Sequence, residues 1–278
     1  MGRPQQAPLF VFFMLTSTHN PRVRAVRALL DRRRNREDER RFVAEGVRLI
    51  EAALDAGVRP DVAFYVADLL ENDRGRLLIA RLRDVAETIE VSDGVMDTLS
   101  DTETPQGVVA VLPFLDPAAL PGTDEGGAPL VLMVDGVRDP GNLGTLLRSA
   151  AAVGVSEVLL APGTVDLYNP KAVRAGMGAH FVVRAEALDW PGIAARLARL
   201  AVRVAVARAR QPYDRVDWTG GSALIVGGEA EGVGAEAWRV AREGVSIPMR
   251  GQVESLNAAM AATIILFEAD RQRRAHGR

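Results

Sequence analysis

The second half of the sequence alternates apolar runs with helical stretches. The run PLVLMVDGV, residues 129–137, is apolar almost throughout, which is typical of a strand that helices cover on both faces. The next stretch, GNLGTLLRSAAAVG, is expected to form a helix that ends at Gly154. The alternation continues through strands expected at 156–163, 202–207, 222–228 and 244–249, and then a helix from about Ser255. This order predicts an α/β fold with a parallel sheet, whose ligands bind beyond the carboxyl ends of the strands.

Residues 14–112 show a shorter alternation of the same kind. Apolar spacing predicts helices over 21–34, 42–57 and 74–87, and strands over 61–68 and 107–114. We therefore expect a small N-terminal α/β domain.

A stretch rich in proline and glycine separates these two parts of the chain. Residues 113–129, PFLDPAALPGTDEGGAP, lack a long apolar run and have the composition of a linker. The predicted domains are therefore 14–112 and 130–275. Residues 1–13 are interpreted as an extension or a misassigned start, because MLTSTHNPRVRAVRALL reads as the start of a domain.

Composition excludes several kinds of protein. The chain has 278 residues, 48% of them hydrophobic, which is enough for a sizeable core. It has no cysteine, so disulfides and thiolate sites are excluded and a cytoplasmic location is favoured. No apolar run reaches the roughly 20 residues of a membrane span. The three histidines, His19, His180 and His276, lack ligand spacing, so no metal is expected.

Three predicted strands run into loops with unusual side chains. The first loop, 135–150, places Gly141, Asn142 and Gly144 before a helix that carries Arg148. The second, 224–234, is LIVGGEAEGVG, and the third, 247–268, is IPMRGQVESLNAAMAATIILFE. Glycines allow close backbone approach to a ligand, and helix N-termini favour anions.

Each loop also has a purely structural interpretation. The first is then a glycine-rich turn, the second a flexible turn with solvated carboxylates, and the third a turn in which Ser255 caps the last helix. Asn257 fits this interpretation less well, because it precedes an apolar stretch and its amide needs hydrogen-bond partners.

Taken together, the three loops resemble the motifs of the SpoU (TrmH-type) RNA 2′-O-ribose methyltransferases of the SPOUT superfamily. Asn142 and Arg148 match the first motif, and Gly227 and Glu229 match the second. The third motif is matched by Ile247, Pro248, Met249, Gly251, Ser255, Leu256 and Asn257. Residues 14–112 resemble the family's accessory, ribosomal-protein-like RNA-binding domain more weakly.

The resemblance implies S-adenosylmethionine as methyl donor, a trefoil knot around its site, and a homodimer with active sites near the subunit interface. It implies cofactor contacts from Gly227, Ile247, Met249 and Leu256. It also implies catalytic roles for Arg148, Asn142, Glu229, Ser255 and Asn257.

A ribose 2′-hydroxyl must lose its proton before it can attack a methyl group. Arg148 is one candidate for the acceptor. A free guanidinium has a pKa above about 12, which favours a different role, in which Arg148 clamps a phosphate and a phosphate oxygen assists. Both alternatives stay open at the level of sequence.

The resulting prediction is an RNA 2′-O-ribose methyltransferase that acts on 23S ribosomal RNA. The alternatives are the same chemistry on transfer RNA, or a non-catalytic RNA-binding assembly factor. A nucleotide-binding dehydrogenase is disfavoured, because no G-x-G-x-x-G spacing follows a strand.

RNA binding requires positive charge, and the segment 22–41 supplies it. It holds nine arginines against four acidic residues, a balance of 9 − 4 = +5, although a solvated helix could look the same. The predicted RNA contacts are Arg22, Arg24, Arg32, Arg33, Arg34, Lys171 and Arg174.

Overall fold

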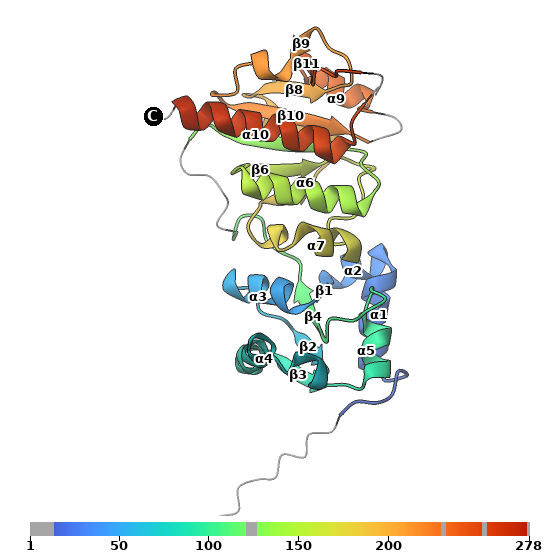
Figure 1. The fold of residues 1–278 in the computed structure, drawn as a ribbon. Coiled ribbons are helices and arrows are strands. Elements are labelled where there is room, and N and C mark those ends of the chain that lie inside the picture. The colour runs from blue at the N-terminus through green and yellow to red at the C-terminus, as the bar shows by residue number, and fades with distance from the viewer. Residues whose placement is uncertain (1–13, 121–126, 229–231, 252–254, 277–278) are drawn as a thin grey trace, which may run out of the picture.

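The computed structural model describes residues 14–120, 127–228, 232–251 and 255–276. They form two α/β bodies, each built on its own sheet and stacked along one long axis (Figure 1). The predicted α/β class is thereby confirmed. Within the described ranges, no helix is long and apolar enough to cross a membrane.

The N-terminal sheet has the strand order β1–β4–β2–β3. Its strands are β1 (Arg41–Glu45), β2 (Val62–Tyr65), β3 (Glu87–Glu90) and β4 (Val108–Pro113). β4 is antiparallel to β1 and β2, whereas β2 and β3 are parallel. Helices α1 (Pro21–Asp31) and α5 (Asp93–Leu99) cover one face, and α3 (Val47–Asp55) and α4 (Asp73–Val85) cover the other. The short helices are α2 (Arg33–Glu39) and η1 (Asp68–Leu70).

The helix expected over 42–57 is wrong in its first part, because residues 41–45 form β1 and the helix begins only at Val47. Phe42 packs on one face of the sheet and Val43 on the other. An apolar run that is buried on both faces cannot be distinguished from a buried helix by periodicity. Gly46 makes the turn between strand and helix with a φ of 101°, a conformation that favours glycine.

The C-terminal sheet has the order β7–β6–β5–β10–β8–β11–β9, and every pair in it is parallel. Its strands are β5 (Leu130–Asp135), β6 (Glu157–Leu160), β7 (Ala185–Ala187), β8 (Ala201–Ala205), β9 (Gln211–Pro212), β10 (Ser222–Gly227) and β11 (Glu243–Ser246). After β5 the chain adds β6 and β7 on one side of that strand, and it then forms β8 to β11 on the other side. The order therefore reverses between β5 and β10, where parallel sheets open a crevice for ligands.

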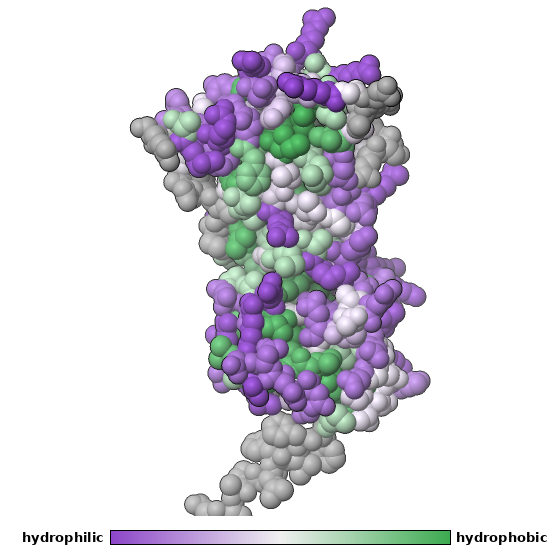
Figure 2. Space-filling view, in the orientation of Figure 1, coloured by the Kyte–Doolittle hydropathy of each residue, from purple (hydrophilic) through white to green (hydrophobic). Residues whose placement is uncertain are grey.

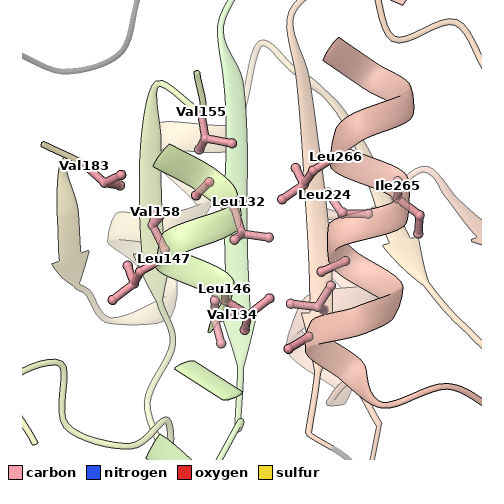
Figure 3. Packing of buried hydrophobic residues seen from close by; sticks show 14 of the residues in the cluster. Leu132, Val134, Leu146, Leu147, Val155, Val158, Val183, Leu224, Ile265 and Leu266 are labelled. Carbon is pink, nitrogen blue, oxygen red and sulfur yellow. The ribbon is translucent and has the colours of Figure 1, made fainter. Parts of the chain in front are cut away.

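Helices cover both faces of this sheet. One face is covered by α6 (Pro140–Ala152), α7 (Pro170–Gly176) and α10 (Ala258–His276), and the other by α8 (Trp190–Leu197) and α9 (Ala235–Val240). Short 3-10 helices, η2 (Ala179–Phe181) and η3 (Tyr213–Arg215), complete the body. Figure 3 shows Leu132 of β5 and Leu224 of β10 in one buried cluster with Leu146 of α6 and Leu266 of α10. This burial explains why the strands are apolar almost throughout.

The two bodies are packed against each other through the segment around α7 (Figure 1). Tyr168 stacks between Phe42 and Phe114, with ring centroids 4.6 and 4.1 Å apart. Its hydroxyl accepts a hydrogen bond from the Leu115 backbone N–H at 3.0 Å, and burial raises the pKa of Tyr168 to about 12. Phe114 and Leu115 belong to the stretch expected to be a linker, yet both pack against this cluster.

Candidate active site

A cavity of about 510 Å³ lies where β8, β10 and β11 end and α10 begins. It therefore occupies the carboxyl edge of the sheet, as the strand order predicts. Its walls are Ala205, Val206, Ala207, Val226, Gly227, Gly228, Gly232, Val233, Ile247, Met249, Ser255, Leu256, Asn257, Ala258, Ala261 and Ile265.

All four residues predicted to contact a cofactor lie in these walls, namely Gly227, Ile247, Met249 and Leu256. Ser255 and Asn257 line the same cavity. Glu229, which was predicted from the second motif, lies outside the described residues. The walls are mostly apolar side chains and glycine backbone, an environment suited to an aromatic ring held by main-chain hydrogen bonds.

Gly227 occupies a place that a larger residue cannot take. A Cβ atom there would lie 2.2 Å from the Gly232 carbonyl carbon and 2.5 Å from the Val233 nitrogen. The end of β10 thus touches the returning backbone of its own loop. The glycine of the second motif is required for this close approach.

A second cavity, of about 300 Å³, adjoins the first. The two share Gly228 and Gly232 in their walls. The smaller one is more polar and is also lined by Asp135, Gly136, Val137, Arg138, Asp139, Asn142, Pro162, Gly163 and Gly234.

Asn142 and Asn257 join the two cavities. The Asn257 Nδ2 donates a hydrogen bond to the Asn142 Oδ1 at 3.2 Å, although the residues are 115 positions apart. Asn142 lines the smaller cavity and Asn257 the larger. The sequence motifs that contain them therefore meet at one place.

The last helix begins at Ala258, and its cap is Asn257 rather than Ser255, which corrects the expectation from sequence. The Asn257 Oδ1 accepts hydrogen bonds from the backbone N–H groups of Ala259 at 2.9 Å and Met260 at 3.2 Å. One amide thus caps α10 with its oxygen and holds Asn142 with its nitrogen, which supplies the partners that sequence analysis required.

Two carboxylates hold the smaller cavity in shape. The Asp135 Oδ2, in a buried side chain, accepts a hydrogen bond from the Gly234 N–H at 2.6 Å. Asp139 caps α6 by accepting from the Asn142 N–H at 2.8 Å, and its other oxygen lies 3.5 Å from the Lys171 Nζ. Lys171, predicted as an RNA contact, is thus ion-paired beside this cavity.

Arg148 lies apart from both cavities. It is exposed on α6, six residues beyond Asn142, which corresponds to about 9 Å along the helix axis. Its neighbour Ser149 hydrogen-bonds Thr263 of α10 at 2.7 Å, so this side of α6 faces α10. The structure therefore does not bring Arg148 together with Asn142, Ser255 and Asn257 in one chain.

Most of the predicted RNA contacts lie in ion pairs. Arg22 pairs with Glu87, Arg33 with Glu37, Arg34 with Asp38, and Arg174 with Asp101. Arg24 and Arg32 are exposed and form no ion pair with a described residue.

Sequence analysis missed part of the wall. Val206 and Ala207 follow β8, and Val233 lies in the loop after β10. The run VRVAVA is a strand that ends at the same edge of the sheet as the motif loops. This position in the sheet was the one indication that its last residues could line the site. Because these side chains are small and apolar, nothing in the sequence marks them as site residues.

The fold and the joined cavities define an α/β protein that binds ligands at the carboxyl edge of a parallel sheet. Residues 129–267 match the SpoU rRNA methylase family, and residues 20–110 match the MRM3-like substrate binding domain. The chain belongs to the SpoU rRNA methylase family.

Individual relatives span both bodies. The chain is 36% identical to mitochondrial rRNA methyltransferase 3 of Mus musculus, over 91% of this chain and 72% of the relative. It is 32% identical to the 23S rRNA (guanosine(2553)-2′-O)-methyltransferase RlmP of Bacillus subtilis, over 86% of this chain and 92% of the relative. Among solved structures, the SpoU methyltransferase AviRb of Streptomyces viridochromogenes in complex with AdoMet superposes with a TM-score of 0.83. It is 30% identical and covers 92% of this chain and 99% of that chain.

Proposed function

We propose that the protein is an S-adenosylmethionine-dependent 2′-O-ribose methyltransferase that acts on 23S ribosomal RNA. The observation that carries the proposal is the Asn142–Asn257 hydrogen bond, which joins an apolar cavity to a polar one at the carboxyl edge of the sheet. Membership of the SpoU family and relatives named as 23S rRNA 2′-O-methyltransferases support the same reaction.

The larger cavity suits the cofactor. Its volume of about 510 Å³ lies within the ordinary range for small-molecule sites, and Val206, Ile247 and Leu256 offer apolar walls for the adenine. Ser255, Asn257 and the glycine backbone would bind the polar groups. When bound, S-adenosylmethionine supplies the methyl group for the ribose 2′-hydroxyl.

The smaller cavity is where the target ribose would enter, because it shares a wall with the cofactor cavity. Asn142, held by Asn257, would orient the ribose, and the charged groups of Asp135, Arg138 and Asp139 give this cavity the polarity that a nucleoside requires. The role proposed for Arg148 is to clamp a phosphate so that a phosphate oxygen assists removal of the proton. Arg148 as the base is the alternative.

The position of Arg148 supports a homodimer. On α10, Met260 and Phe267 expose 55% and 47% of their surface and share a helix face with Thr263, which hydrogen-bonds Ser149, the residue after Arg148. Figure 2 shows hydrophobic surface in the region of α10. A dimer that buries this face would place Arg148 at the subunit boundary. Size-exclusion chromatography with light scattering tests this, because Phe267→Glu should yield monomers.

Finer features are proposed on the same family grounds. A trefoil knot around the cofactor site is proposed from membership of the SpoU family alone. We also propose that the chain divides into an accessory RNA-binding domain, 14–112, a linker, 113–129, and a methyltransferase domain, 130–275. A cytoplasmic location is proposed as well.

Methyl transfer from labelled S-adenosylmethionine to unmodified ribosomal RNA and transfer RNA tests the activity. We expect label in large-subunit ribosomal RNA, located by mapping of 2′-O-methyl groups. Label in transfer RNA alone would overturn the substrate. A folded protein that binds RNA and transfers no label to any RNA would be an assembly factor instead.

A further inference from the structure

Arginines in two parts of this protein differ in how many of them are ion-paired. In the segment 22–41, six of the nine arginines lie within 4.0 Å of a carboxylate. These pairs reduce the field that this segment presents to a phosphate backbone. A different group of arginines, next to the cofactor cavity, has no such pairs with the residues that the structure describes.

This second group is Arg208, Arg210 and Arg250, which we call the rim arginines. All three are exposed, and none is ion-paired with a described residue. Arg208 directly follows Ala207 and Arg250 directly follows Met249, two residues that line the cofactor cavity. Arg208 and Arg250 are therefore adjacent in the chain to residues of the cavity wall, and Arg210 lies two residues beyond Arg208.

Arg208 and Arg210 lie in the segment between β8 and β9, and this segment is hydrogen-bonded to β11, the strand that precedes Arg250. β9 pairs with β11 in parallel register, Gln211 with Val245 and Pro212 with Ser246. The Val206 N–H donates to the Val245 carbonyl at 3.0 Å, and the Ser246 Oγ donates to the Ala209 carbonyl at 3.4 Å. These bonds fix the segment that carries Arg208 and Arg210 beside β11, and Arg250 follows four residues after the end of that strand. Figure 2 shows hydrophilic surface over the end of the molecule that holds β9 and β11.

We propose that the rim arginines bind the RNA phosphates that flank the target nucleotide. This inference rests on the proposed function, because an RNA strand must pass the cavity mouth to deliver a ribose. Its phosphates carry one negative charge each, and a guanidinium binds them through paired N–H groups. Three guanidinium groups beside the cavity can make these bonds without first breaking an ion pair to a described carboxylate.

The salt dependence of RNA binding tests this inference. The probe is a 30-nucleotide single-stranded RNA of mixed sequence, and fluorescence anisotropy gives its affinity between 50 and 300 mM salt. The slope of log K against log salt is negative, and each lost phosphate contact reduces its magnitude by about 0.7 for a single strand. Arg208→Gln/Arg210→Gln should therefore reduce this magnitude by about 1.4. Arg250→Gln should reduce the magnitude of the slope by about 0.7.

The matched control removes the same charge elsewhere. Arg74 and Arg76 of α4 are exposed and ion-paired with Glu51 and Asp73. Arg74→Gln/Arg76→Gln should leave the slope nearly unchanged. An equal drop in this control, or no drop in the rim variants, overturns the proposal.

Calorimetry with S-adenosylmethionine separates two roles for the same arginines. The rim variants should bind it with the affinity of the unaltered protein, and a tenfold loss would assign them to the cofactor instead, overturning the proposal. Neither measurement uses turnover, so the result for the rim arginines does not depend on whether the protein methylates RNA. A wild-type protein that methylates no RNA would count against the proposed function alone.

Discussion

Arg36 and Asp166 form a buried ion pair that joins the two bodies of the protein. Two guanidinium nitrogens, Nε and one Nη, each lie 2.7 Å from the Asp166 Oδ2, and the side chains are only 3% and 10% exposed. The Arg36 Nη1 also donates to the Leu29 carbonyl at 2.5 Å. The pair thus ties the end of α1 to the segment that leads into α7.

Neutralising Asp166 should destabilise the protein strongly. Asp166→Asn keeps the oxygen that accepts from the Tyr168 N–H, but it leaves the Arg36 charge buried without a counter-charge. Loss of one partner from a buried pair costs about 3–5 kcal/mol. Urea unfolding measures this cost. Glu87→Gln is the control, because it breaks the exposed Arg22–Glu87 pair and should cost less than about 1 kcal/mol.

Acid should also destabilise the protein through His180. Its ring is buried, its Nε2 lies 2.9 Å from the Leu167 carbonyl, and burial lowers its pKa from 6.5 to about 4. Because folding lowers this pKa, the unfolded chain binds the proton more tightly, and stability falls as the pH drops from about 6.5 toward about 4.

The loss from His180 between pH 7 and pH 5 should be about 2 kcal/mol. Urea unfolding of the unaltered protein and His180→Gln at both values measures it. Glutamine keeps a donor for Leu167 but does not titrate, so the variant should lose about 2 kcal/mol less. An identical pH dependence in both proteins would contradict this prediction.

The sequence predicted the C-terminal body well because its strands have one simple pattern. Runs such as residues 129–137 are apolar on both faces, and parallel strands place their carboxyl ends together. The strand pattern therefore indicated that ligands bind at the carboxyl edge of this sheet, whereas the family resemblance supplied both the ligand and its contacts, Gly227, Ile247 and Leu256.

The partners of individual polar residues could not be predicted in the same way. Arg36 sits among nine arginines within 22–41, and nothing local distinguishes the one that pairs with Asp166, 130 residues away. Likewise Ser255 and Asn257 are both acceptable helix caps, and only the packing of α10 against α6 selects Asn257. Periodicity describes which face is buried, whereas long-range pairing depends on the assembled fold.

The two roles of Asn257 can be separated by substitution. Asn257→Asp keeps an oxygen that can cap α10 but removes the Nδ2 donor to Asn142. We expect stability near that of the unaltered protein and a loss of at least tenfold in kcat. Asn257→Ala removes both roles and should cost about 1 kcal/mol as well. Thermal unfolding and methyl-transfer rates measure the two effects, and full turnover in Asn257→Asp would show that the contact with Asn142 is dispensable.

Adding one methyl group at Gly227 should weaken cofactor binding strongly. In Gly227→Ala the new Cβ would lie 2.2 Å from the Gly232 carbonyl carbon, so the loop after β10 would have to move away from the cavity wall. Gly220→Ala is the matched control, because a Cβ there meets no atom within 4 Å. Calorimetry with S-adenosylmethionine should show normal affinity for the control and at least a hundredfold loss for Gly227→Ala. Circular dichroism must show that the variant remains folded, since the backbone clash could also lower its stability. If a folded Gly227→Ala protein binds S-adenosylmethionine normally, the contact between the end of β10 and its loop does not shape the cofactor site.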